Sequence, residues 1–113
     1  MQGYGTVHHV AFRVDEREDL EEWNQRLRSF RLPTSGYVER YYFGSLYTRV
    51  SREILFELAT DGPGFMNDEP YETLGEKLAL PPFLEPKREL IERIVRPFDT
   101  TRSNKVFQKE YED

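Results

Sequence analysis

The spacing of the apolar residues changes twice within the first sixty positions, and this change constrains the fold more than any other feature of the chain. Residues 6–14 are rich in β-branched and aromatic side chains that alternate between two faces, which predicts a strand. Apolar residues at intervals of three and four follow and predict a helix that ends near Pro33: Leu20, Trp23, Leu27 and Phe30. Beyond residue 37 the two-residue period returns.

Three short β-prone runs make up the returning pattern, at residues 37–43, 46–50 and 54–59, with Gly44-Ser45 predicted as a break between the first two. The order strand, helix, strand, strand, strand predicts an α+β fold built on a βαβββ module. A curved sheet with one helix leaves one face open, so we expect the module to pair with a second one.

The module is expected to span residues 5–65, and residues 66–113 are expected to form a C-terminal loop and helical tail. The loop begins near Asp61-Gly62-Pro63-Gly64. Short helices are predicted at residues 71–78 and 86–95, the second with Pro86 in its first turn.

The start of the first helix and the two faces of the first strand can also be predicted. Asp15 and Glu18 have the spacing of a capping box. Even-numbered strand residues, His8 among them, form the expected core face beneath the helix: Val10, Phe12 and Val14. His9 falls on the opposite face.

Composition excludes several classes of function. The 113 residues fit one domain, and 21 acidic against 16 basic residues give a net charge of −5, which disfavours a nucleic-acid or anionic-membrane partner. No cysteine is present, which removes disulfides, thiolate nucleophiles and cysteine-based zinc sites. No run approaches the roughly 20 apolar residues of a membrane span, and the N-terminus lacks the features of a signal peptide, so a cytoplasmic location is expected.

His9 and Glu57 carry the chemistry that the pattern offers. In the last predicted strand Glu57 lies on the face opposite Ile54, Phe56 and Leu58, so both side chains point to the open face. Imidazole and carboxylate together suit Fe(II), Mn(II), Ni(II) or Zn(II). His8 would be the ligand only if the assignment of faces were shifted by one residue.

Three separated stretches carry a resemblance to a known family: GTVHHVAFRV at residues 5–14, ILFELATDGPGF at 54–65 and LGEKLALPP at 74–82. They resemble the last module of bacterial ring-cleaving dioxygenases linked to hydroquinone and catechol compounds. These enzymes belong to the vicinal-oxygen-chelate superfamily, with glyoxalase I and the extradiol dioxygenases. The resemblance implies that His9 and Glu57 are metal ligands and that a preceding module or a second copy of the chain supplies the third.

The resemblance also implies a role for Tyr47, as a catalytic residue that hydrogen-bonds the bound diol. Tyr41 and Tyr42 remain alternatives for this role. The chain departs from the family at Ser51-Arg52-Glu53, where a glycine-rich turn is usual, and this changes the hairpin but not the position of the ligand.

Two classes of function therefore remain open. The first is the metal-binding module of an extradiol-type ring-cleaving dioxygenase, with Fe(II) or alternatively Mn(II) as cofactor and an aromatic diol and dioxygen as substrates. The second is a non-catalytic glyoxalase-like module for small-molecule binding or assembly. In either case the expected partner is a second βαβββ module, either in a homodimer or in the same protein. Arg13 and Arg49 are candidates for orienting an anionic substrate, although salt bridges to nearby acids are the better expectation for both.

Overall fold

The computed structural model describes residues 3–106, and the chain divides into two compact units, Met1–Gly64 and Phe65–Asp113. The first unit contains β1 (Val10–Arg13), α1 (Arg17–Ser29), β2 (Thr34–Glu39), β3 (Gly44–Arg49) and β4 (Leu55–Ala59). The second contains the 3-10 helices η1 (Phe65–Asn67), η2 (Tyr71–Thr73) and η3 (Pro82–Lys87), followed by α2 (Arg88–Ile94). The predicted α+β class and βαβββ order are confirmed.

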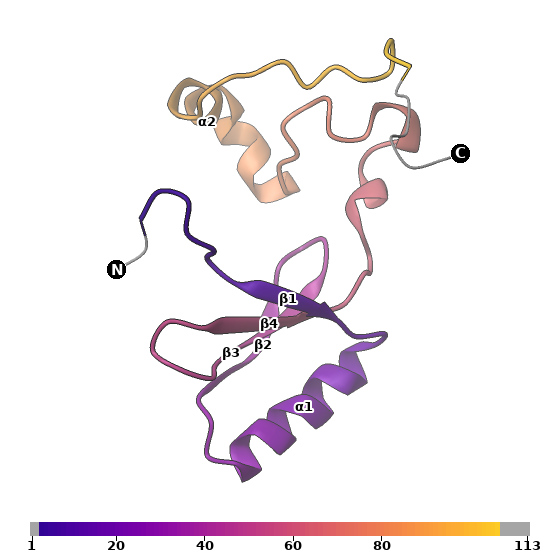
Figure 1. The fold of residues 1–113 in the computed structure, drawn as a ribbon. Coiled ribbons are helices and arrows are strands. Elements are labelled where there is room, and N and C mark those ends of the chain that lie inside the picture. The colour runs from indigo at the N-terminus through magenta and orange to yellow at the C-terminus, as the bar shows by residue number, and fades with distance from the viewer. Residues whose placement is uncertain (1–2, 107–113) are drawn as a thin grey trace, which may run out of the picture. The chain divides into compact units, whose positions relative to one another are not determined.

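The strands form one mixed sheet in the order β1-β4-β3-β2. β1 runs parallel to β4, and the other two pairings are antiparallel. α1 lies across one face of this sheet (Figure 1). Among residues 3–64 no helix lies on the opposite face.

A small leucine cluster holds α1 to the sheet and consists of Leu20, Leu27, Leu46 and Leu58. α1 packs mainly over β2 and β3. The prediction that it covers Val10 and Phe12 is therefore wrong, because these β1 residues keep 46% and 47% of their surface exposed. Val14, just beyond β1, does pack against the cluster.

The buried stripe of α1 also differs from the predicted one, and its members are Leu20, Asn24 and Leu27. Trp23 and Phe30 remain 40% and 67% exposed. Asn24 is tolerated in the interior because its Oδ1 accepts a hydrogen bond from the Thr34 hydroxyl at 3.2 Å. The helix begins one residue later than predicted: the amide of Glu16 donates to Asp19 Oδ2 at 2.8 Å.

Gly44 and Ser45 form the beginning of β3, where a break was predicted. The glycine is needed because the ring of Tyr37 lies over it: a Cβ atom at position 44 would approach Tyr37 Cε2 to 2.6 Å. β2 begins earlier than predicted, at Thr34, and contains an irregularity at Gly36, which has a φ of 68° that favours glycine.

Arg88 connects several segments of the second unit. It donates a hydrogen bond to the carbonyl of Leu78 at 3.0 Å and forms ion pairs with Glu85 and Glu92 at 2.6 and 2.9 Å. The predicted helix at 86–95 is present as α2, whereas the one at 71–78 is reduced to the single turn of η2. No helix within residues 3–106 is long and apolar enough to cross a membrane.

Candidate metal centre

Strand pairing brings His9 and Glu57 together. In the parallel register Ala11 of β1 lies opposite Glu57 of β4. His9 comes directly before β1, where no pairing with β4 fixes its direction, and its position is given by its contact with Glu57. His9 Nε2 lies 2.9 Å from Glu57 Oε2. The two ligands predicted from the sequence are therefore in direct contact.

The Glu57 carboxylate is held by two hydroxyl groups from β3. Ser45 Oγ donates to Glu57 Oε1 at 2.5 Å, and the Tyr47 hydroxyl donates to the same oxygen at 2.8 Å. Glu57 is only 5% exposed, so these bonds and His9 offset the cost of burying a carboxylate. One oxygen is therefore fixed by β3 while the other faces His9.

Tyr47 stands opposite Glu57 in the antiparallel register, which brings its hydroxyl within reach. Burial, and next the hydrogen bond to Glu57, raise the pKa of the Tyr47 phenol, so it keeps its proton and acts as a donor. The Arg40 guanidinium lies 5.8 Å from the centre of the Tyr47 ring. A positive charge therefore stands beside the tyrosine on its side of the sheet.

His8 is not packed beneath α1, contrary to the prediction from strand alternation. It is exposed, and its Nδ1 lies 2.7 Å from Nδ1 of His9. Because β1 pairs with β4 only from Val10 onward, no ladder fixes the direction of residue 8. The contact with His8 occupies one nitrogen of His9 and turns the other toward Glu57.

The alternative candidates lie elsewhere. Of the three tyrosines considered, Tyr47 is the one that bonds to Glu57, whereas Tyr42 is buried. Arg13 forms a salt bridge with Asp61 at 2.5 Å, as expected from the sequence. Arg49 instead donates a hydrogen bond to the carbonyl of Arg52 at 3.3 Å. Residues 3–106 contain no group of three or more His, Asp or Glu side chains placed to hold a metal.

Sequence reasoning missed Ser45 and Arg40. Ser45 was assigned to a break between strands, although its place two residues before Tyr47 was a signal, because both then share a face with Glu57 once β3 starts at Gly44. Arg40 lies in the turn after β2, where no periodicity predicts the direction of a side chain.

Comparison with known proteins places these observations in a family. The chain is 53% identical over 96 residues to the Bacillus subtilis protein named "Putative ring-cleaving dioxygenase MhqA", covering 85% of this chain and 30% of that protein. It is 38% identical over 89 residues to a chlorohydroquinone/hydroquinone 1,2-dioxygenase of Sphingobium indicum, covering 74% of this chain and 26% of the relative. No family model matches.

A solved structure agrees with the sequence matches. The crystal structure of a "putative dioxygenase" from Bacillus subtilis superposes with a TM-score of 0.79 at 45% identity, covering 88% of this chain and 32% of that one. The chain thus spans about 30% of the length of the relatives it matches. Over most of its own length, this chain is a homologue of one module of the ring-cleaving dioxygenases.

Proposed function

We propose that this chain contributes His9 and Glu57 as ligands of a divalent metal in a ring-cleaving dioxygenase that acts on aromatic diols of the hydroquinone or catechol class. The observation that carries the proposal is the 2.9 Å approach of His9 Nε2 to Glu57 Oε2, with the second carboxylate oxygen held by Ser45 and Tyr47.

The donor set fits such a metal. Two ligand atoms that each lie about 2.1 Å from one metal ion, at a right angle to each other, are about 3.0 Å apart, close to the separation found here. An imidazole nitrogen and a carboxylate oxygen belong to the two-histidine, one-carboxylate set that holds Fe(II) in oxygenases. Fe(II) is the proposed cofactor, and Mn(II) is the alternative.

A bound metal of this kind would hold the diol and dioxygen side by side. The side chains around it would orient its ligand and the diol. Ser45 and Tyr47 fix the orientation of Glu57, and the oxygen of Tyr47 keeps lone pairs that can accept a hydrogen bond from a diol hydroxyl. Arg40 puts a positive charge near that hydroxyl, which favours a diol that has lost a proton.

For ring cleavage, the third ligand is proposed to come from a histidine of a second βαβββ module elsewhere in a longer protein. Support comes from the first unit itself. Its helix covers one face of the sheet, and Ala11, which stands opposite Glu57 in the register, is exposed, as is Val7 just before β1. Apolar residues on a face without a helix favour a covering partner.

Metal analysis tests this proposal directly. The full chain is purified without chelator, loaded with Fe(II) or Mn(II) under anaerobic conditions, and its metal content measured beside His9→Ala and Glu57→Ala. Both variants should lose the stoichiometric metal, while Glu53→Gln, an exposed carboxylate in the turn before β4, serves as the matched control and should retain it. A parent chain without metal, or variants that bind it like the parent, would favour the non-catalytic module.

A further inference from the structure

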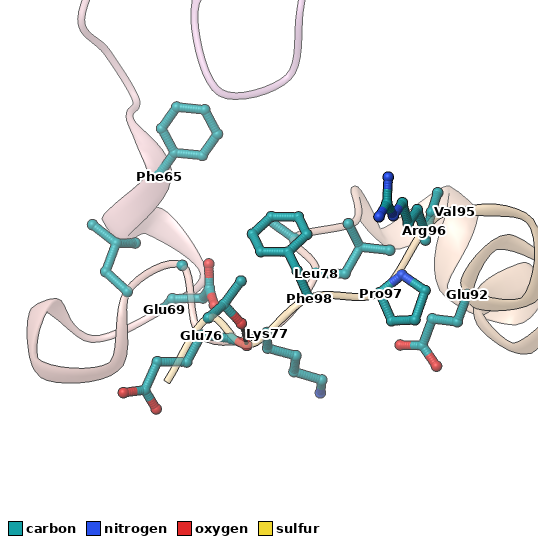
Figure 2. A pocket seen from close by; sticks show the side chains of 14 residues that line it. Phe65, Glu69, Glu76, Lys77, Leu78, Glu92, Val95, Arg96, Pro97 and Phe98 are labelled. Atoms are coloured by element: carbon teal, nitrogen blue, oxygen red, sulfur yellow. Dashed lines mark hydrogen bonds between the residues drawn. The ribbon is translucent and has the colours of Figure 1, made fainter. Parts of the chain in front are cut away.

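The second unit contains a pocket of about 680 Å³ whose apolar walls include Phe65, Leu78 and Phe98 (Figure 2). The charged side chains that line it are three glutamates and two cations, so their balance is negative, and its described lining selects no particular ligand. The first unit holds a more restrictive feature, the buried carboxylate of Glu57 together with the two hydroxyl groups that bond to it.

Both of these hydroxyl groups donate to the same oxygen of the Glu57 carboxylate. Ser45 Oγ lies 2.5 Å and Tyr47 Oη 2.8 Å from Oε1, whereas the other oxygen, Oε2, lies 2.9 Å from His9 Nε2. A carboxylate oxygen has two lone-pair positions, so the two hydroxyls fill both positions of Oε1. A position for a metal is therefore left on Oε2 alone.

Ser45 is held in place by the sheet. It is completely buried, and its strand position pairs with Ala59 of β4. Because the serine has no exposed surface, water cannot take over its hydrogen bond to Glu57. Tyr47 is partly exposed and is also the proposed partner of the diol, so Ser45 is the hydroxyl that bonds to Glu57 whether or not a diol is bound.

We propose that Ser45 is a positioning residue that, together with Tyr47, restricts Glu57 to a single metal-binding oxygen. This inference rests on the proposed function and adds how much of the metal the carboxylate occupies. A carboxylate with both oxygens free can bind one metal through both of them and then takes two positions. Held to one oxygen, Glu57 leaves a further position for the ligand from another module, for the diol or for dioxygen.

The relaxation of water protons by bound Mn(II) tests the proposal, because the relaxation per bound ion rises with the number of water molecules on the metal. The full chain, Ser45→Ala and Tyr47→Phe are each saturated with Mn(II), and Glu57→Ala gives the background from Mn(II) bound elsewhere. Each hydroxyl variant should lose the contribution of about one water molecule per bound ion, because the freed carboxylate oxygen takes its place. Alanine fills nearly the same space as serine, so the fold should be retained.

Thr48→Val is the matched control. Thr48 is another buried side chain of β3, but it lies on the opposite face, and its hydroxyl donates to the carbonyl of Pro33 at 2.8 Å. This variant loses a buried hydrogen bond without touching Glu57, so its water relaxation should equal that of the parent.

The possible outcomes separate this proposal from the function on which it rests. A Ser45→Ala protein with the relaxation of the parent would overturn the role of Ser45, as would an equal loss in Thr48→Val. A loss in Tyr47→Phe alone would assign the role to the tyrosine and overturn it for the serine. A parent chain that relaxes water no more than Glu57→Ala would instead overturn the ligand pair itself.

Discussion

At the scale of single residues, the two oxygens of Glu57 have different surroundings. Oε1 accepts hydrogen bonds from the hydroxyls of Ser45 and Tyr47 on β3, and Oε2 contacts Nε2 of His9. Because the carboxylate is nearly closed to water, it cannot rotate without losing these hydrogen bonds. If Glu57 binds a metal as proposed, its carboxylate has lost its rotational freedom beforehand. Ser45, which is fully buried, therefore orients Glu57 without belonging to the proposed ligand pair.

The two neighbouring histidines should respond differently to truncation. His8→Ala is expected to leave the free energy of unfolding within about 0.5 kcal/mol of the parent, because His8 is exposed and packs under no helix. The same change should lower metal affinity about tenfold or more, because His9 loses the contact that orients its ring. Urea unfolding and metal titration measure the two effects. A large loss of stability in His8→Ala would mean that this histidine belongs to the core after all.

At the scale of elements, the packing of α1 depends on a few leucines. Leu46→Ala on β3 should lower the free energy of unfolding by about 2–5 kcal/mol, because Leu46 is completely buried in the leucine cluster. Phe30→Ala, at the end of α1, removes a larger but exposed side chain and should cost less than about 1 kcal/mol. Thermal or urea unfolding measures the loss of stability in both variants. Equal losses would contradict the observed packing of α1, in which Leu46 is buried and Phe30 is exposed.

The hydrogen bonds that Glu76 Oε1 accepts from the amides of Arg102 and Ser103 should open in acid. The hydrogen bonds from Ser103, and next that from Arg102, hold the pKa of the Glu76 carboxyl below its usual value of 4.5. A lowered pKa in the folded state means that the contribution to stability is present above the usual value and is lost as the pH falls through the lowered one. The amide resonance of Ser103 should therefore shift with a midpoint below pH 4.5, and Glu76→Gln should abolish the shift. A midpoint at or above 4.5 would show that these hydrogen bonds are not formed in solution.

Much of this architecture could be predicted because the two periods of the sequence are physical consequences of strand and helix geometry. The order of elements followed from these two periods, and the expectation that His9 and Glu57 lie close together agrees with their contact, although His9 itself precedes β1. The start of β3 could not be predicted in the same way. Gly44 signals a turn in isolation, and only the ring of Tyr37, brought in by the neighbouring strand, explains a glycine there.

The interior position of Asn24 escaped prediction for a similar reason. A stripe scored by apolar residues alone favours Trp23, while the hydroxyl that satisfies Asn24 comes from Thr34, on the next element. The direction of His8 likewise depends on where pairing with β4 begins. These features depend on contacts between elements, which the local pattern of one sequence does not contain.

At the scale of the whole molecule, the first unit has one helix for a sheet with two faces, and we expect it to associate. At micromolar concentration, light scattering of the chain should give a mass near twice that of the monomer, because burying Val7 and Ala11 against a symmetry mate removes apolar surface from water. Such a pair would gather two copies each of His9 and Glu57, a set that resembles glyoxalase I more than a dioxygenase. Ring cleavage by the chain paired only with itself is therefore not expected.

The control for association is a charge placed on the same face. Ala11→Glu should shift the equilibrium to monomer without unfolding the chain, since Ala11 is exposed and lies at the sheet edge. The matched change Val50→Glu, at an exposed position directly after β3, should leave the mass unchanged. A parent chain that stays monomeric on concentration would exclude pairing through this face.

The parallel pairing of β1 with β4 has a further consequence for how the protein is made. Val10 lies beside Phe56, so β1 has no hydrogen-bonding partner in the sheet of the first unit until 46 more residues have been synthesised. β2, β3 and β4 can pair with their sequence neighbours, whereas β1 must wait for a distant one, and distant pairings form more slowly than local ones. The contact between His9 and Glu57 therefore arises with the closure of the sheet, so a nascent chain can bring these two residues together only once its first unit is essentially complete.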